Sequence, residues 1–174
     1  DDFLLGEAPP NRLYPGEENS GRLVSLLKQK SREKAEELGL DLILADGAPG
    51  IGCPVISSLS GTDMVIAVTE PTPSGLHDLT RVLELASHFR IQAGVVINKS
   101  DLNEDYCQEI EEYCLKQGHA LLGRLPLDRA VTEAMCERKV VTEYATGHLS
   151  QELEAIWKAA LERLAHITDN KDAA

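Results

Sequence analysis

The chain has 174 residues, the length of a single domain, and its 17 basic and 29 acidic residues give a formal net charge of −12. This acidic balance argues against a nucleic-acid partner, because proteins that bind phosphate backbones concentrate Lys and Arg. No apolar run approaches the roughly 18 residues of a membrane span, so we expect no membrane insertion. The 4 cysteines have no C-x-x-C spacing, which favours a reduced, cytoplasmic chain over a zinc ribbon or ferredoxin.

Apolar runs alternate with amphipathic stretches along most of the chain. Residues 1–19 are rich in Pro and Gly, so we expect an irregular segment there with at most a short strand at 3–5, and we expect a tail at 169–174. Strands are predicted at 41–46, 64–69, 91–97 and 119–125, and helices at about 20–38, 54–59, 75–90, 103–117, 128–138 and 150–167. Val140 and Val141 are expected on or beneath the sheet, and Ser150 as a helix cap. The order predicts an α/β fold with a mostly parallel sheet flanked by helices over 20–168.

The stretch 41–54 carries the clearest chemical pattern. Four apolar residues between Asp41 and Asp46 predict a buried parallel strand, and the Gly/Pro-rich run that follows predicts a tight loop. Ligands bind at the carboxyl ends of strands in open α/β sheets. A carboxylate followed by glycines at that edge suits a Mg²⁺-phosphate. A strand end followed by an ordinary loop explains the same residues without a ligand.

A second candidate follows the strand at 91–97. The amide of Asn98 offers both a donor and an acceptor to a purine edge. Asn98, Lys99 and Asp101 also spell N-K-x-D, the guanine-reading motif of GTPases, in which the carboxylate accepts two hydrogen bonds from guanine. A polar loop ending in a helix cap is the alternative without a ligand.

Five stretches in order carry a family resemblance. They are GEENSGRLV at 16–24, DGAPGIGCPV at 46–55, VTEPTPSGLHDL at 68–79, INKSDLN at 97–103 and LPLDRAVTEAM at 125–135. Together they resemble the MinD/ParA-type P-loop ATPases, the group that includes the nitrogenase iron protein. The particular branch they resemble carries an inserted ferredoxin domain with two 4Fe-4S clusters.

The resemblance implies roles for individual residues. Asp46 would hold Mg²⁺ through water, and the N–H of Gly50 would contact the γ-phosphate of ATP. Asn98, Lys99 and Asp101 would lie at the base. The loop with Pro126 and Asp128 would lie against the base and ribose, although a strand-ending Pro and an Asp helix cap explain these two residues equally well. Two subunits would sandwich Mg-ATP, and hydrolysis would drive transfer of electrons, a cluster or a metal to a redox or metalloprotein partner.

Cys53 lies 7 residues after Asp46, the spacing at which the nitrogenase iron protein carries a ligand to its shared 4Fe-4S cluster. One such cysteine in each subunit of a dimer gives only two ligands. A small buried residue before Pro54 is an equally good interpretation. Cys107 and Cys114 fall on one helix face and are predicted to be packing residues.

The motif that would cradle phosphates, G-K-G-G-x-G-K-[ST] in this family, does not occur in the sequence. We therefore expect the C-terminal part of a longer ATPase, inactive alone, with the phosphate loop and the 4Fe-4S domain in a missing N-terminal part. Two alternatives remain open: a non-catalytic α/β interaction module that docks through the acidic helices at 103–117 and 150–167, and a GTPase of the same fold.

Overall fold

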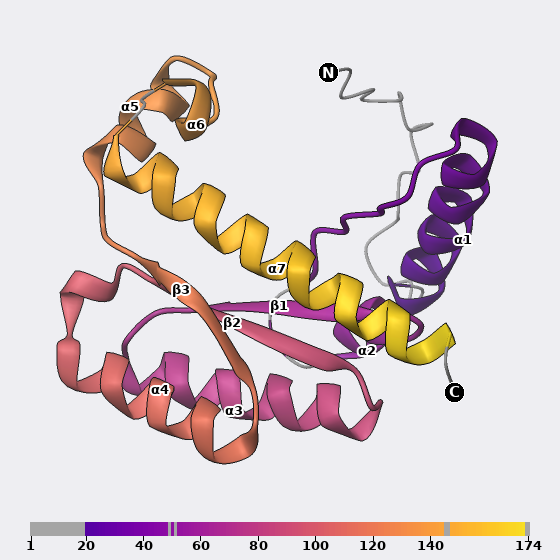
Figure 1. Ribbon diagram of the computed structural model, residues 1–174, viewed down its shortest axis with the longest axis horizontal. Helices are drawn as coiled ribbons and strands as arrows, with labels where there is room; N and C mark the ends of the chain where they lie inside the picture. The colour runs from indigo at the N-terminus through magenta and orange to yellow at the C-terminus, as the bar shows by residue number, and fades with distance from the viewer. Residues whose placement is uncertain (1–19, 49, 51, 145–146, 173–174) are drawn as a thin grey trace.

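The computed structural model describes residues 20–48, 50, 52–144 and 147–172, so the segment predicted to be irregular at 1–19 lies outside the described residues. A sheet of three parallel strands in the order β1-β2-β3 forms the centre. The strands are β1 (Met64–Thr69), β2 (Gln92–Asn98) and β3 (Ala120–Leu125). Each lies within one residue of a predicted strand, and their alternation with helices confirms the predicted α/β fold (Figure 1).

Three helices begin at side-chain caps that the sequence offers. Side-chain oxygens of Thr72, Asn103 and Asp128 accept hydrogen bonds from backbone N–H groups in the first turns of three helices. The expected cap Ser150 is wrong, because it lies inside a helix that starts at His148, and its side chain is buried. The helical elements are α1 (Ser20–Leu38), α2 (Cys53–Leu59), α3 (Pro73–His88), the short 3₁₀ helix η1 (Ser100–Leu102), α4 (Glu104–Gln117), α5 (Arg129–Cys136), α6 (Val141–Tyr144) and α7 (His148–Asp172).

Helices cover both faces of the sheet, with α3 and α4 on one side and α7 crossing the other (Figure 1). The main core lies between the sheet and the α3/α4 layer, where Leu83, Val95 and Ile97 have no exposed surface. Cys107 and Cys114 are buried in the same core, which confirms their prediction as packing residues. On the other face Gly123 admits α7, because a Cβ there would lie 2.6 Å from Cγ1 of Ile156.

The predicted strand at 41–46 is wrong. The segment has no assigned strand structure, and Leu44 is 70% exposed. A buried parallel strand needs a hydrogen-bonded neighbour, and none of the described residues pairs with this one. Val140 and Val141 are likewise not on the sheet: Val140 is exposed, and Val141 begins α6.

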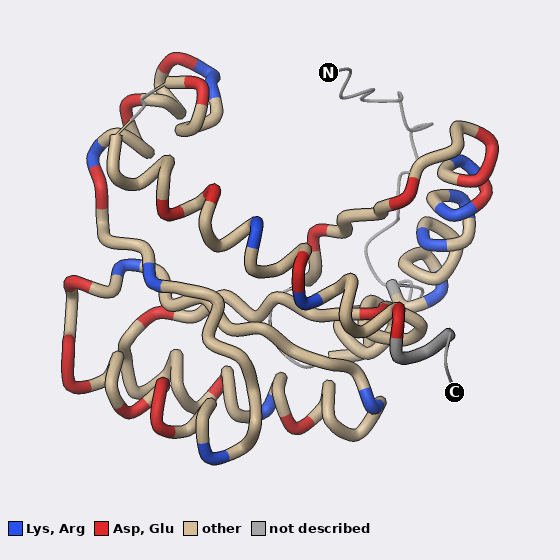
Figure 2. The backbone as a smooth tube through the Cα atoms, viewed as in Figure 1, with Lys and Arg blue, Asp and Glu red and all other residues tan. Residues whose placement is uncertain are grey.

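Helix α1 packs on α2 and stands apart from the sheet (Figure 1). Acidic positions are spread over helices on both sides of the sheet instead of forming one patch (Figure 2). Within the described part of the chain, no helix is both long enough and apolar enough to cross a bilayer.

Candidate nucleotide-binding edge

Three loops that carry predicted site residues meet at one edge of the sheet. Because the strands are parallel, with Thr69 beside Ile97 and Asn98 beside Leu125, their carboxyl ends lie together. Glu70 follows β1 directly, the N-K-x-D residues begin at the end of β2, and Pro126 follows β3. The fold therefore brings Asn98, Lys99, Asp101, Pro126 and Asp128 to a single edge, where α/β sheets bind ligands.

An ion pair joins the first two loops. The Nζ of Lys99 lies 2.6 Å from Oε1 of Glu70, with both side chains partly exposed. Lys99 has a left-handed backbone at φ +55°, which is uncommon outside Gly and Asn. The turn that this backbone creates lets Oδ1 of Asn98 accept a hydrogen bond from Lys99 N at 3.1 Å, which orients the Asn98 amide.

The Glu70 loop is shaped by close backbone packing. Thr69 donates its hydroxyl hydrogen to Gly75 O at 3.0 Å, and the Thr72 hydroxyl accepts from Gly75 N at 3.0 Å. A Cβ at Gly75 would fall against the carbonyl oxygen of Glu70. The loop therefore requires glycine at this position.

Two carboxylates organise the loop after β3. Oδ1 of Asp101 accepts a hydrogen bond from Leu127 N at 2.6 Å, and Oδ1 of Asp128 accepts from Ala130 N at 2.8 Å. Asp128 thus caps α5, which is the ligand-free role considered for it above. Asp101 links the loops after β2 and β3.

Arg124 forms two ion pairs close to these loops, and no sequence motif predicted them. Its Nε lies 2.7 Å from Glu111 and its Nη1 lies 2.9 Å from Glu104, so β3 is tied to α4 just before the edge. Hydrogen bonds to the Glu111 and Glu104 carboxylates raise the pKa of Arg124, and the bond from Arg124 lowers the pKa of Glu104. The available sequence signal is the single charge within the otherwise apolar run 120–125.

The predicted switch residues Asp46 and Gly50 are not part of the three edge loops. Asp46 is exposed in the extended segment that follows α1, and no hydrogen bond or ion pair of the described residues joins it to the edge loops. Gly50 has φ +85°, a conformation that favours glycine, while both of its sequence neighbours lie outside the described residues.

Within the described part of one chain, the cysteines are not grouped as metal ligands. Cys53 is the exposed first residue of α2, and Cys136 is also exposed. Cys107 donates a hydrogen bond to Ser100 O at 3.2 Å, and burial raises the pKa of Cys114 to about 11. Among the residues with described positions, no three His, Cys, Asp or Glu side chains are grouped as ligands. The described part of one chain therefore does not fit a 4Fe-4S cluster, which takes four thiolates.

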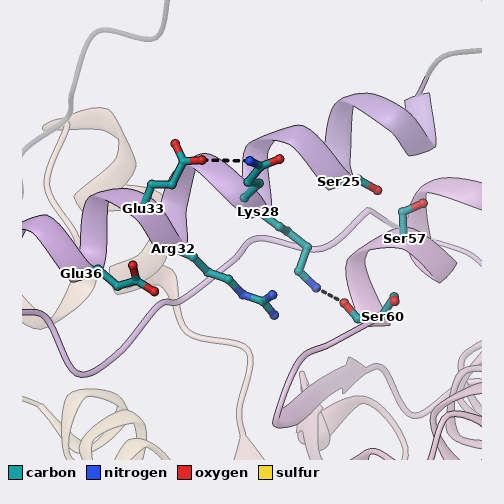
Figure 3. Close-up of a pocket in the computed structure, with 8 residues that line it drawn as sticks. Ser25, Lys28, Arg32, Glu33, Glu36, Ser57 and Ser60 are labelled. Atoms are coloured by element: carbon teal, nitrogen blue, oxygen red, sulfur yellow. Dashed lines mark hydrogen bonds between the residues drawn. The ribbon is translucent and has the colours of Figure 1, made fainter.

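A polar cavity of about 400 Å³ lies between α1 and α2 (Figure 3). Its cations already have partners, because Lys28 Nζ donates to Ser58 O and Ser60 O at 2.6 Å each, and Arg32 donates to Gly61 O. Burial is the main cause that lowers the pKa of Lys28. These side chains bind carbonyls at the end of α2 and in the turn that follows it, and they fasten α1 to this region.

No known family model matches the chain, but individual relatives do. The uncharacterized protein MJ0578 of Methanocaldococcus jannaschii is 34% identical over 91 residues, which are 52% of this chain and 32% of the relative. The cytosolic Fe-S cluster assembly factor Nubp1 homolog of Drosophila melanogaster is 25% identical over 162 residues, covering 82% of this chain and 50% of the relative. The chain thus spans half or less of the length of these curated relatives.

Solved structures resemble the chain over most of its length. The cell division ATPase MinD of Pyrococcus furiosus superposes with a TM-score of 0.64 at 20% identity, covering 82% of this chain and 58% of that one. A ParA family ATPase from Chlorobium tepidum gives a TM-score of 0.62 at 23% identity, covering 80% and 57%. The chain therefore has the parallel α/β fold of the MinD/ParA-type P-loop ATPases.

Proposed function

We propose that this chain supplies the base-binding edge and the switch segment of a Mg-ATP-dependent protein that couples its nucleotide state to the transfer of electrons, an iron-sulfur cluster or a metal. One observation carries the proposal: the loops after all three parallel strands are joined at the carboxyl edge by the pairs Glu70–Lys99 and Asp101–Leu127. Loops that are held together in this way form a preformed binding surface for a planar ligand.

Each site residue has a chemical role in this proposal. The Asn98 amide pairs with the purine edge, and Pro126 offers the base an apolar face. Asp46 holds Mg²⁺ through water, and the Gly50 N–H meets the terminal phosphate. A carboxylate and a backbone N–H are the groups that such chemistry uses, and both belong to a loop that can move when the phosphate leaves.

The phosphate cradle comes from another stretch of polypeptide in this proposal. Two features of the described residues support that idea. β1 is hydrogen-bonded on one side only, to β2, and Val68 on β1 is 63% exposed. The apolar segment 42–44 is also exposed. An added strand that pairs with β1 would cover apolar surface that is otherwise in water, and a lysine loop after that strand would reach the phosphates.

The iron-sulfur part of the proposal rests on the name of the Nubp1 relative and on the resemblance of the five motifs. In this proposal the 4Fe-4S ligands come from outside this chain, two copies form a homodimer around the nucleotide, and the acceptor is a redox or metalloprotein. Cys53 contributes at most one ligand from each copy, on a helix that directly follows the switch loop.

A binding experiment on the natural full-length protein, prepared without oxygen, tests the proposal. We expect Mg²⁺-dependent ATP binding that GTP does not displace, and loss of hydrolysis in Asp46→Ala. Asp41→Ala is the matched control, because Asp41 is an exposed carboxylate at the other end of the same segment. Displacement of ATP by GTP would favour the GTPase alternative. Absence of any nucleotide binding would overturn the proposal and favour the interaction module.

A further inference from the structure

The side chain of Asp101 is directed at a neighbouring loop. We propose that Asp101 is a positioning residue that holds the loop 126–128 in place for the base, and that it does not itself read the base. This inference rests on the proposed function for its nucleotide, but the contact that carries it lies wholly within this chain.

The backbone around Asp101 fixes its direction. Lys99 adopts the left-handed conformation, and Leu102 N donates to Lys99 O at 3.0 Å, which closes the 3₁₀ turn η1. The buried Cys107 thiol donates to Ser100 O from the α4 side of the same turn. The turn is therefore held at its start and its middle, and its carboxylate meets Leu127 N at 2.6 Å.

The loop on the other side depends on this contact. Pro126 has no backbone N–H to donate. Among the described residues, the Leu127 amide donates its hydrogen bond to Asp101. Leu127 is 57% exposed, so packing holds it weakly. The next residue, Asp128, caps α5. The Asp101 contact is thus what places the two residues before that cap.

This geometry separates two roles for the carboxylate. A guanine reader must direct both oxygens at the two donors on the base, whereas a positioning residue needs one oxygen on Leu127 N. Asparagine keeps an acceptor oxygen at the same position but introduces donors where guanine also presents donors. Asp101→Asn therefore retains a positioning role and destroys a guanine-reading role, while Asp101→Ala destroys both.

Titrations of the full-length protein with ATP, GTP and xanthosine triphosphate distinguish these roles. We expect Asp101→Asn to stay within about threefold of the parent in ATP affinity, since a neutral acceptor is roughly half as strong as a charged one. We expect Asp101→Ala to lose about tenfold, the equivalent of about 1.4 kcal/mol. Asp105→Ala is the control, because it removes an exposed carboxylate from the first turn of α4. A switch from GTP to xanthosine triphosphate in Asp101→Asn would overturn the inference.

A second readout needs no nucleotide. The exchange rate of the Leu127 amide proton, measured by NMR in the free protein, should rise about tenfold or more in Asp101→Ala and change little in Asp101→Asn and Asp105→Ala. Unchanged exchange in Asp101→Ala would refute the positioning role whatever the affinities are. Changed exchange together with no ATP binding in any form would support the contact and refute the proposed function instead.

Discussion

Replacing Gly75 with alanine tests the packing of the Glu70 loop. The added Cβ would lie 3.0 Å from the Thr69 hydroxyl and 3.1 Å from the Thr72 hydroxyl, and it would fall against the Glu70 carbonyl. Overpacking of this kind costs about 1–3 kcal/mol. Alanine recovers about 0.5–1 kcal/mol in a helix. We therefore expect Gly75→Ala to lower the free energy of unfolding by about 0.5–2 kcal/mol.

Urea unfolding followed by circular dichroism measures this loss as a lower midpoint at unchanged slope. Gly47→Ala is the control, because a Cβ there meets nothing within 4 Å. The variant should also weaken ATP binding in the full-length protein, since the displaced loop carries the partner of Lys99. Equal or greater stability of Gly75→Ala would refute the close packing, because helix propensity alone favours alanine.

Two further predictions concern the core and the α1 helix. The Cys114 pKa of about 11 lies above its ordinary value of 9.0, so the unfolded chain loses this proton first as pH rises. The stability that the protonated Cys114 thiol gives the folded state is complete below pH ~9 and is lost as the pH rises toward ~11. About 1.4 kcal/mol of the free energy of unfolding is lost at pH ~10. Denaturant titrations at both ends of this range should show that loss, and Cys114→Ala should show a smaller one. Lys28→Met should destabilise the docking of α1 on α2 by about 1 kcal/mol, because the carbonyls of Ser58 and Ser60 lose their donor. Hydrogen exchange in α1 should then be faster than in Lys30→Met, and equal exchange in the two variants would contradict the anchoring role.

Hydrophobic pattern predicted most of the fold because most elements are defined locally. The apolar runs that became β1, β2 and β3 are bounded by polar or turn residues, and Thr72, Asn103 and Asp128 are ordinary helix caps. The run at 41–46 has the same pattern but fails, since strand formation also requires a partner strand that the described residues do not supply. Local pattern alone cannot distinguish these cases.

The edge could be predicted in outline but not in its contacts. Parallel topology places Asn98 and Asp128 at one edge, so their grouping follows from the sequence. The bond from Leu127 to Asp101 spans 26 positions and depends on how the loops after β2 and β3 face each other. The pairing of Arg124 with Glu104 likewise depends on the packing of α4 against β3. Such contacts follow from tertiary packing and not from motif spacing.

Hydrogen exchange of the full-length protein with and without Mg-ATP would locate the nucleotide that we propose to bind at the carboxyl edge of the sheet. We expect slower exchange at 98–102 and 125–129 on ATP binding, with no change in the last turns of α4. ATP binding that leaves both loops unchanged, or that protects only the cavity between α1 and α2, would contradict that proposal.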